Sequence, residues 1–153
     1  MTGFRRRPDG PTAVDIHGPP AAPAVRWVVR GRPLSSYLAE ALGSAWLVVA
    51  ALTAVSFTMR ADGAYLSSWP LLPRLAVVGV SVGGAVAVFA LTPPGKESGA
   101  HLNPAISLFM ALRGVLGVTD LIAYGVFQLT GSVLGVLLTR TLWGIGSPRW
   151  TTV

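Results

Sequence analysis

The stretch Ser98-Gly99-Ala100-His101-Leu102-Asn103-Pro104-Ala105-Ile106-Ser107-Leu108 lies between two strongly apolar runs. It opens with small residues, turns at Asn103-Pro104 and continues as an apolar segment that ends near Arg113. At 1.5 Å per residue, a helix over 104–113 is about 15 Å long, which is half the thickness of a bilayer's hydrocarbon core. The stretch therefore predicts a chain that enters a membrane halfway and turns back.

The composition of the whole chain is that of a membrane protein. Of its 153 residues, 52% are hydrophobic and 12% are charged, whereas an ordinary soluble domain carries about 25% charged residues. The formal net charge is +6, but no aromatic or basic platform follows the N-terminal tail, so we expect no nucleic acid as a partner. Arginines gather before the first apolar run: Arg5, Arg6, Arg7, Arg26, Arg30 and Arg32. By the positive-inside rule this asymmetry predicts a cytoplasmic N-terminus. We expect a multi-pass protein of the plasma membrane.

Three segments are apolar enough to form membrane helices, at about 35–59, 75–91 and 119–138. Pro93 and Pro94 are predicted to end the second helix. The second and third segments each carry a pair of glycines four residues apart, a spacing that lets another helix backbone approach closely. These pairs are Gly79 with Gly83 and Gly131 with Gly135.

The expected organisation has three parts. Residues 1–33 are rich in proline and basic residues, and we expect a disordered cytoplasmic tail. Residues 34–140 form the membrane domain, and residues 141–153 form a short C-terminal tail.

The central stretch has the chemistry of a solute path. Irregular backbone at membrane depth is tolerated only where it is buried in protein or lines a water-filled cavity, so the Gly99, Ala100 and His101 carbonyls are expected to serve as a ladder of hydrogen-bond acceptors. Asn103 stands at the N-cap position and Pro104 at the first helical position. The positive end of the helix dipole, placed at the membrane midplane, would repel cations. The alternative is a plain capped surface helix, which is the better interpretation of Asn-Pro in a soluble protein.

The motif His101-Leu102-Asn103-Pro104-Ala105-Ile106-Ser107 resembles the signature of the aquaporin and glycerol-facilitator family, also called the major intrinsic proteins. Ala39-Glu40-Ala41-Leu42-Gly43-Ser44 resembles the opening of the family's first helix, and Tyr124 with Gln128 and Gly131 resembles its third. The resemblance covers residues 34–138 and the N-terminal half of the family fold. It implies an all-α membrane protein with three transmembrane helices and one re-entrant half-helix, equivalent to one repeat of the aquaporin fold. It also implies a channel for passive transport of water or small neutral solutes.

The resemblance assigns roles to individual residues. Asn103, Pro104 and Ala105 match the pore motif, called the NPA motif. Gly99, Ala100 and His101 match the pore-lining loop, although His101 is equally consistent with a loop anchor and with a contact to solute.

Two further residues match the family's support for that loop. Glu40 matches its buried carboxylate, and the alternative is a side chain that reaches the nearby membrane interface. Gln128 is the weaker match, and helix packing explains it better than a place in the pore.

The resemblance also leaves a gap. The family is an inverted repeat whose two halves meet at the midplane, and this sequence carries one Asn-Pro-Ala motif. We therefore expect a truncated half that needs a second half-repeat or a homo-oligomeric partner. The alternative function is a non-conducting membrane fragment that packs against other membrane helices.

Nothing in the sequence indicates covalent chemistry. The chain has no cysteine, its two histidines are isolated and its few carboxylates are scattered. We expect no enzyme activity, no catalytic residue, no metal site and no cofactor.

A first prediction concerns Gly83, which is reached by counting back from Asn103 without gaps. It matches the selectivity-filter position at which the family's water channels carry a bulky aromatic residue, so glycine should leave a wider opening. In a reconstituted full-length channel that contains this half, Gly83→Phe should reduce uptake of a polyol or urea more than uptake of water. Equal loss of all three permeabilities in a stopped-flow measurement would refute the assignment.

Overall fold

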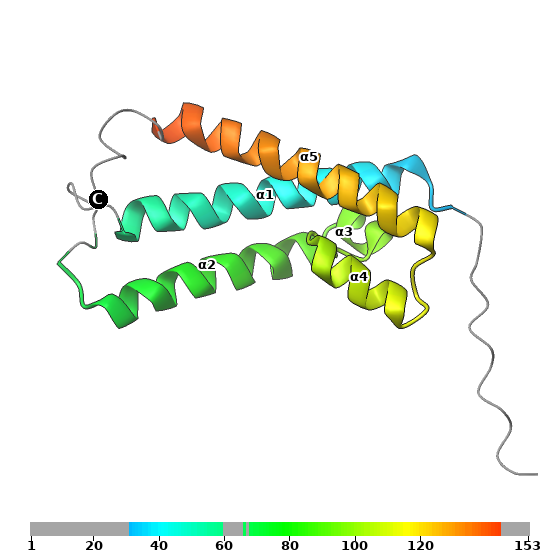
Figure 1. Ribbon diagram of the computed structural model, residues 1–153. Helices are drawn as coiled ribbons and strands as arrows, with labels where there is room; N and C mark the ends of the chain where they lie inside the picture. Colours follow the sequence, from blue (N-terminus) through cyan, green and yellow to red (C-terminus); the bar gives the residue numbers. More distant parts are fainter. Residues whose placement is uncertain (1–30, 60–65, 67, 145–153) are drawn as a thin grey trace, which may run out of the picture.

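The computed structural model describes residues 31–59, 66 and 68–144. All regular structure in this part of the chain is helical (Figure 1), as expected for an all-α membrane protein. The helices are α1 (Leu34–Met59), α2 (Leu71–Leu91), α3 (Pro93–Ser98), α4 (Pro104–Leu112) and α5 (Val118–Trp143). Most of the predicted N-terminal tail, and the predicted C-terminal tail from residue 145 onwards, lie outside the described residues.

Three of these helices are long and apolar enough to cross a membrane: α1, α2 and α5. At 1.5 Å per residue, the 26 residues of α1 and of α5 extend about 39 Å and the 21 residues of α2 about 31 Å. The prediction of three transmembrane helices is therefore confirmed. The nine residues of α4 extend only about 13 Å, which is too short to span the bilayer.

The boundaries differ from those predicted in two places. Helix α2 begins at Leu71 rather than near 75 and includes Pro73, because the first N–H groups of a helix have no intrahelical partner and a proline there removes no bond. Helix α5 runs on to Trp143 and ends where Gly144 adopts φ 63°, the left-handed conformation that commonly ends helices.

The short helix α3 was not predicted. The prolines at 93 and 94 follow the end of α2, as expected, but they also begin a new helix. The Thr92 side chain caps that helix by accepting from the backbone N–H of Gly95 at 3.2 Å, and Pro93 occupies its first position. A side chain at Gly95 would place its Cβ 2.0 Å from the carbonyl oxygen of Phe89. The glycine thus allows α3 to fold back tightly against the end of α2.

In this fold many apolar side chains are exposed and many polar ones are buried, the reverse of the pattern in a soluble protein. Many large apolar side chains are exposed on α2, α4 and α5, among them Leu72, Val80, Leu112 and Ile122. The fully buried side chains include polar ones on facing helices: Ser36, Glu40, Ser44, Thr58, Ser107, Gln128 and Thr139. This pattern is typical of membrane helices, in which small and polar residues form the helix contacts and apolar residues meet lipid.

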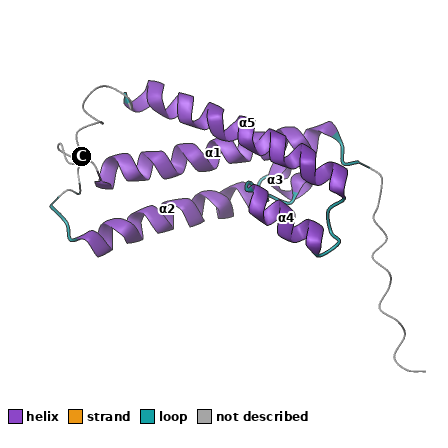
Figure 2. Cartoon of the chain, viewed as in Figure 1, coloured by secondary structure: helices purple, strands orange, loops and turns teal. Residues whose placement is uncertain are grey.

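Helix α1 is the centre of the arrangement, because it contacts α2, α3 and α5. Helix α4 packs on α5, and α2 contacts α1 and α3 but neither α4 nor α5. Figure 1 shows α3 and α4 together at one end of the three long helices, and Figure 2 shows the loops that join them. The fold therefore leaves one side of α2 and of α4 without a partner inside the described chain.

The two glycine pairs behave differently. A Cβ on Gly131 would lie 2.0 Å from the Ala41 carbonyl oxygen, and one on Gly135 would lie 2.7 Å from that of Ala45. These glycines allow α5 to approach the backbone of α1 directly. A Cβ on Gly79 or Gly83 would meet nothing within 4 Å, so no described helix uses that pair.

A second prediction follows from this close approach. Gly131→Ala should lower the free energy of unfolding by about 1–3 kcal/mol, because the new methyl group has no room against the α1 backbone. Gly125→Ala, on the same helix, meets nothing within 4 Å and should raise it by about 0.5–1 kcal/mol by favouring the helical conformation. Unfolding in mixed detergent micelles measures both, and effects of the same sign would contradict this packing.

Candidate functional site

The segment between α3 and α4, residues 99–103, is called the re-entrant loop below. Its backbone is strained, because Ala100 and Leu102 have φ values of 49° and 54°, and Gly99 has 89°. Residues with a Cβ rarely adopt this left-handed region, and such strain persists only where the surroundings fix the chain. The side chains around the loop must therefore hold it in place.

Glu40 of α1 is the main support. Its side chain is fully buried within the protein. One carboxylate oxygen accepts the His101 backbone N–H at 3.0 Å, and the other accepts that of Leu102 at 2.7 Å. Because hydrogen bonds to a charged acceptor are stronger than neutral ones, this carboxylate fixes the middle of the loop to α1.

Gln128 of α5 completes the support. Its side-chain N–H groups donate to Glu40 at 2.7 Å and to the Ser107 hydroxyl of α4 at 2.9 Å. Gln128 thus joins α5 to both α1 and α4, which goes beyond the helix packing expected from the sequence.

His101 has the contacts of a loop anchor. Its side chain is buried, its Nδ1 lies 3.2 Å from the Ser107 hydroxyl, and its ring lies edge-on to Tyr124 with 5.3 Å between centroids.

The carbonyls of the loop fall into two groups. The Leu102 carbonyl accepts the Ser44 hydroxyl at 3.2 Å. Among the described residues, nothing donates a hydrogen bond to the carbonyl oxygens of Gly99, Ala100 and His101. Three successive acceptors thus have no partner in the part of the chain that the structure describes.

Helix α4 begins as the sequence predicts. Asn103 is its N-cap, with the side-chain oxygen accepting from the backbone N–H of Ala105 at 2.8 Å, and Pro104 is its first residue. Residues Asn103, Pro104 and Ala105 are all exposed in this chain. The free carbonyls therefore lead directly to an exposed, positively polarised helix terminus.

Gly83 lies on α2, which makes no contact with α4. It is exposed, and open space surrounds the position of a Cβ there. The structure thus does not bring Gly83 together with the loop within this chain.

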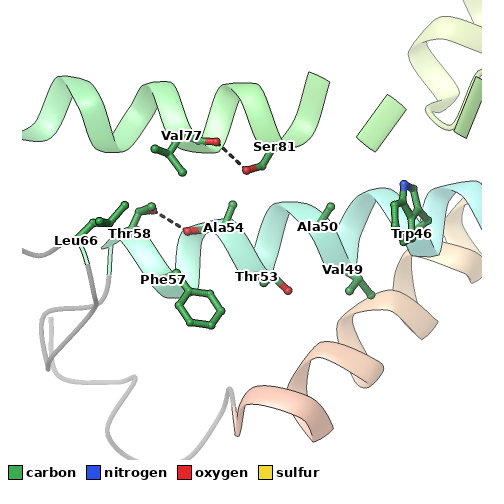
Figure 3. Close-up of a pocket in the computed structure, with 10 residues that line it drawn as sticks. All are labelled: Trp46, Val49, Ala50, Thr53, Ala54, Phe57, Thr58, Leu66, Val77 and Ser81. Carbon is green, nitrogen blue, oxygen red and sulfur yellow. Dashed lines mark hydrogen bonds between the residues drawn. The ribbon is translucent and has the colours of Figure 1, made fainter. Parts of the chain in front are cut away.

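A cavity of about 480 Å³ lies between α1 and α2 (Figure 3). It is lined by Trp46, Val49, Ala50, Thr53, Ala54, Phe57, Thr58, Leu66, Val77 and Ser81. None of the residues predicted for the pore lines it, so this cavity is separate from the re-entrant loop.

Ser44, Ser107 and Tyr124 contribute side-chain contacts that the sequence did not assign. Two of them had a detectable signal, because Ser44 and Ser107 are hydroxyl groups within apolar helices, where buried polar groups pair with one another or with backbone. The Tyr124 hydroxyl donates to the Ser98 carbonyl at 2.7 Å, a contact that only the folded chain reveals.

Comparison with known proteins identifies the family of this chain. The family model described as "Major intrinsic protein" matches residues 29–147. This chain belongs to the major intrinsic protein family. The resemblance drawn from the motif is thereby confirmed.

Individual relatives are similar to this chain at moderate identity. The aquaglyceroporin AqpS of Rhizobium meliloti (strain 1021) is 35% identical over 111 residues, which are 71% of this chain and 43% of that protein. Aquaporin NIP1-2 of Arabidopsis thaliana is 34% identical over 73% of this chain and 35% of its own length. The glycerol uptake facilitator protein of Streptococcus pneumoniae (strain ATCC BAA-255 / R6) is 41% identical over 61 residues, 40% of this chain and 25% of that protein. The chain thus spans less than half the length of these relatives, and no solved structure matches it significantly.

A third prediction tests the carboxylate support. In Glu40→Gln, one side-chain N–H₂ group would face a backbone N–H that needs an acceptor. Amide hydrogen exchange at His101 and Leu102 should therefore rise about tenfold or more, since a hydrogen bond to a charged group contributes about 1.5–3 kcal/mol.

Glu97→Gln is the matched control, because Glu97 is an exposed carboxylate at the same end of the molecule. Its substitution should leave exchange at His101 and Leu102 unchanged. Equal exchange in the two variants would show that Glu40 does not hold the loop.

Proposed function

We propose that this chain forms half of a membrane channel for passive transport of water or small neutral solutes, without enzymatic chemistry or a cofactor. The observation that carries the proposal is the run of three unpartnered carbonyls at Gly99, Ala100 and His101. Each unsatisfied backbone group costs several kcal/mol in lipid, on the order of the transfer cost of an amide. A water-filled path beside the loop satisfies all three.

The ends of this path favour neutral solutes. Solute hydroxyl or water hydrogens can donate to the carbonyls, and the side-chain N–H₂ of Asn103 can donate to a solute oxygen. The N-terminus of α4 carries roughly half a positive charge, which repels cations and hydronium. Asn103, Pro104 and Ala105 are accordingly proposed as the pore motif, and Glu40 with Gln128 as its support.

The proposed orientation places the end with α3 and α4 at the cytoplasmic face of the plasma membrane. Arg32, Lys96 and Arg113 border that end of the membrane helices. Arg140 lies in the last turn of α5 at the opposite end. The basic N-terminal segment decides this orientation by the positive-inside rule.

A second half is proposed as the partner of the open side. Helices α2 and α4 do not contact each other, and Gly79, Gly83 and Gly84 on α2 offer a surface that another helix backbone can approach. A second half-repeat or another copy of the chain would close the path between these helices and shield the carbonyls from lipid. The rival function, a non-conducting packing partner, uses the same exposed faces.

Stopped-flow light scattering on proteoliposomes separates the two functions and provides a fourth prediction. Vesicles that contain the chain should swell or shrink faster than empty vesicles under a water or glycerol gradient. Permeability equal to that of empty vesicles would favour the packing partner over an autonomous channel.

Asn103→Asp is the informative variant, because aspartate caps a helix as well as asparagine does but offers no N–H₂ donor and adds a negative charge. It should lower permeability to neutral solutes and admit cations. Unchanged permeability in this variant would remove Asn103 from the path.

A further inference from the structure

We propose that Arg32 is a positioning residue for the re-entrant loop, acting through the Ser98 carbonyl. The proposal rests on the proposed function of that loop as a solute path. Sequence patterns place Arg32 in the basic tail, where it contributes only to orientation. In the structure it precedes α1 and contacts both α3 and α5.

The guanidinium of Arg32 lies over the end of α3. Its Nη1 donates to the Ser98 carbonyl at 3.0 Å and approaches that of Glu97 at 3.4 Å. These are among the last carbonyls of α3, which have no intrahelical partner. Arg32 therefore supplies a charged donor at the point where the helix ends and the loop begins.

Tyr124 acts on the same carbonyl from α5. Its hydroxyl donates to the Ser98 oxygen at 2.7 Å and accepts from Arg32 Nη1 at 3.3 Å. The guanidinium carbon lies 5.7 Å from the centre of the Tyr124 ring. Both lone pairs of the Ser98 oxygen are thus used, which fixes the direction of this peptide group.

Asp120 in turn fixes Arg32. One carboxylate oxygen of Asp120 accepts the backbone N–H of Arg32 at 2.9 Å and the Tyr37 hydroxyl at 2.7 Å. Asp120 is buried in the first turn of α5, where the helix dipole favours a negative charge. The main chain of Arg32 is therefore held against the start of α5.

The loop is consequently held at its start and at its middle by charged groups of opposite sign. Glu40 holds N–H groups at His101 and Leu102, and Arg32 with Tyr124 holds the carbonyl at Ser98. The free carbonyls of Gly99 and Ala100 lie between these two anchors, and the third belongs to His101, whose N–H bonds to Glu40. Because the backbone in between is left-handed at Gly99 and Ala100, releasing Ser98 would let these carbonyls rotate out of line.

Hydrogen exchange of the full chain in detergent micelles tests the anchor without any need for transport. In Arg32→Met, exchange at the Ala100 amide, which is bonded to the Ser98 hydroxyl at 3.1 Å, should rise about tenfold, while α1 and α5 stay protected. Arg32→Lys keeps a charged donor and should restore part of the protection. Arg113→Met is the matched control, because Arg113 is exposed at the same end, beyond α4, and should change nothing in the loop.

Tyr124→Phe provides a second route, since it removes the other donor to Ser98 and leaves Asp120 with Arg32. Its effect should combine non-additively with that of Arg32→Met, because both act on one carbonyl. Equal loop exchange in Arg32→Met and Arg113→Met, or simple additivity with Tyr124→Phe, would overturn the proposal.

Solute permeability separates this proposal from the proposed function. If the unaltered chain conducts, Arg32→Met should reduce its permeability and Arg113→Met should not; an undiminished permeability of Arg32→Met would overturn the positioning role. If the unaltered chain does not conduct, a channel formed by copies of this chain alone is excluded, and the exchange data alone decide whether Arg32 positions the loop.

Discussion

The structure depends on one buried carboxylate. Glu40 on α1 accepts two backbone N–H groups of the re-entrant loop and one side-chain N–H group of Gln128. A charge away from water is costly unless hydrogen bonds compensate it, and here three donors do so. In return, the carboxylate holds Leu102 in a left-handed conformation that an isolated chain would leave. The conformation of the loop is therefore stable only when α1 and α5 are in place beside it.

Further hydrogen bonds connect the loop and its Glu40 support to α3, α4 and α5. Ser107 links α4 to Gln128 and His101, and Tyr124 links α5 to the end of α3. Burial of apolar side chains contributes little driving force to the association of the helices, because lipid solvates these side chains as well as a protein core does. Specific polar contacts and close glycine packing, as at Gly131, decide how the helices meet. Among the described residues, the carbonyls of Gly99, Ala100 and His101 accept no hydrogen bond from this network.

The faces of α2 and α4 that contact no other described helix bear directly on the proposed function of the loop carbonyls. Within a soluble protein, exposed apolar helices would indicate an aggregation surface or a binding surface. Within a membrane they can face lipid, but three free carbonyls beside them cannot. Water and a second wall together satisfy both requirements, which is why a half-channel is a more consistent function than a solitary helical bundle.

The sequence by itself determined the three apolar spans, the short fourth helix, its Asn103 cap and the family, because these depend on local composition, capping chemistry and a contiguous motif. It did not determine α3, since Pro93 and Pro94 were expected only to end a helix. In the structure the Thr92 side chain caps a second helix that begins at Pro93. Nor did the sequence identify the contacts of Arg32, Asp120 and Tyr124, which are separated by up to 92 positions in the chain. Only the tertiary structure decided those, because a hydrogen bond depends on which groups the packed helices bring within 3 Å or so of each other, and residue type alone does not specify that.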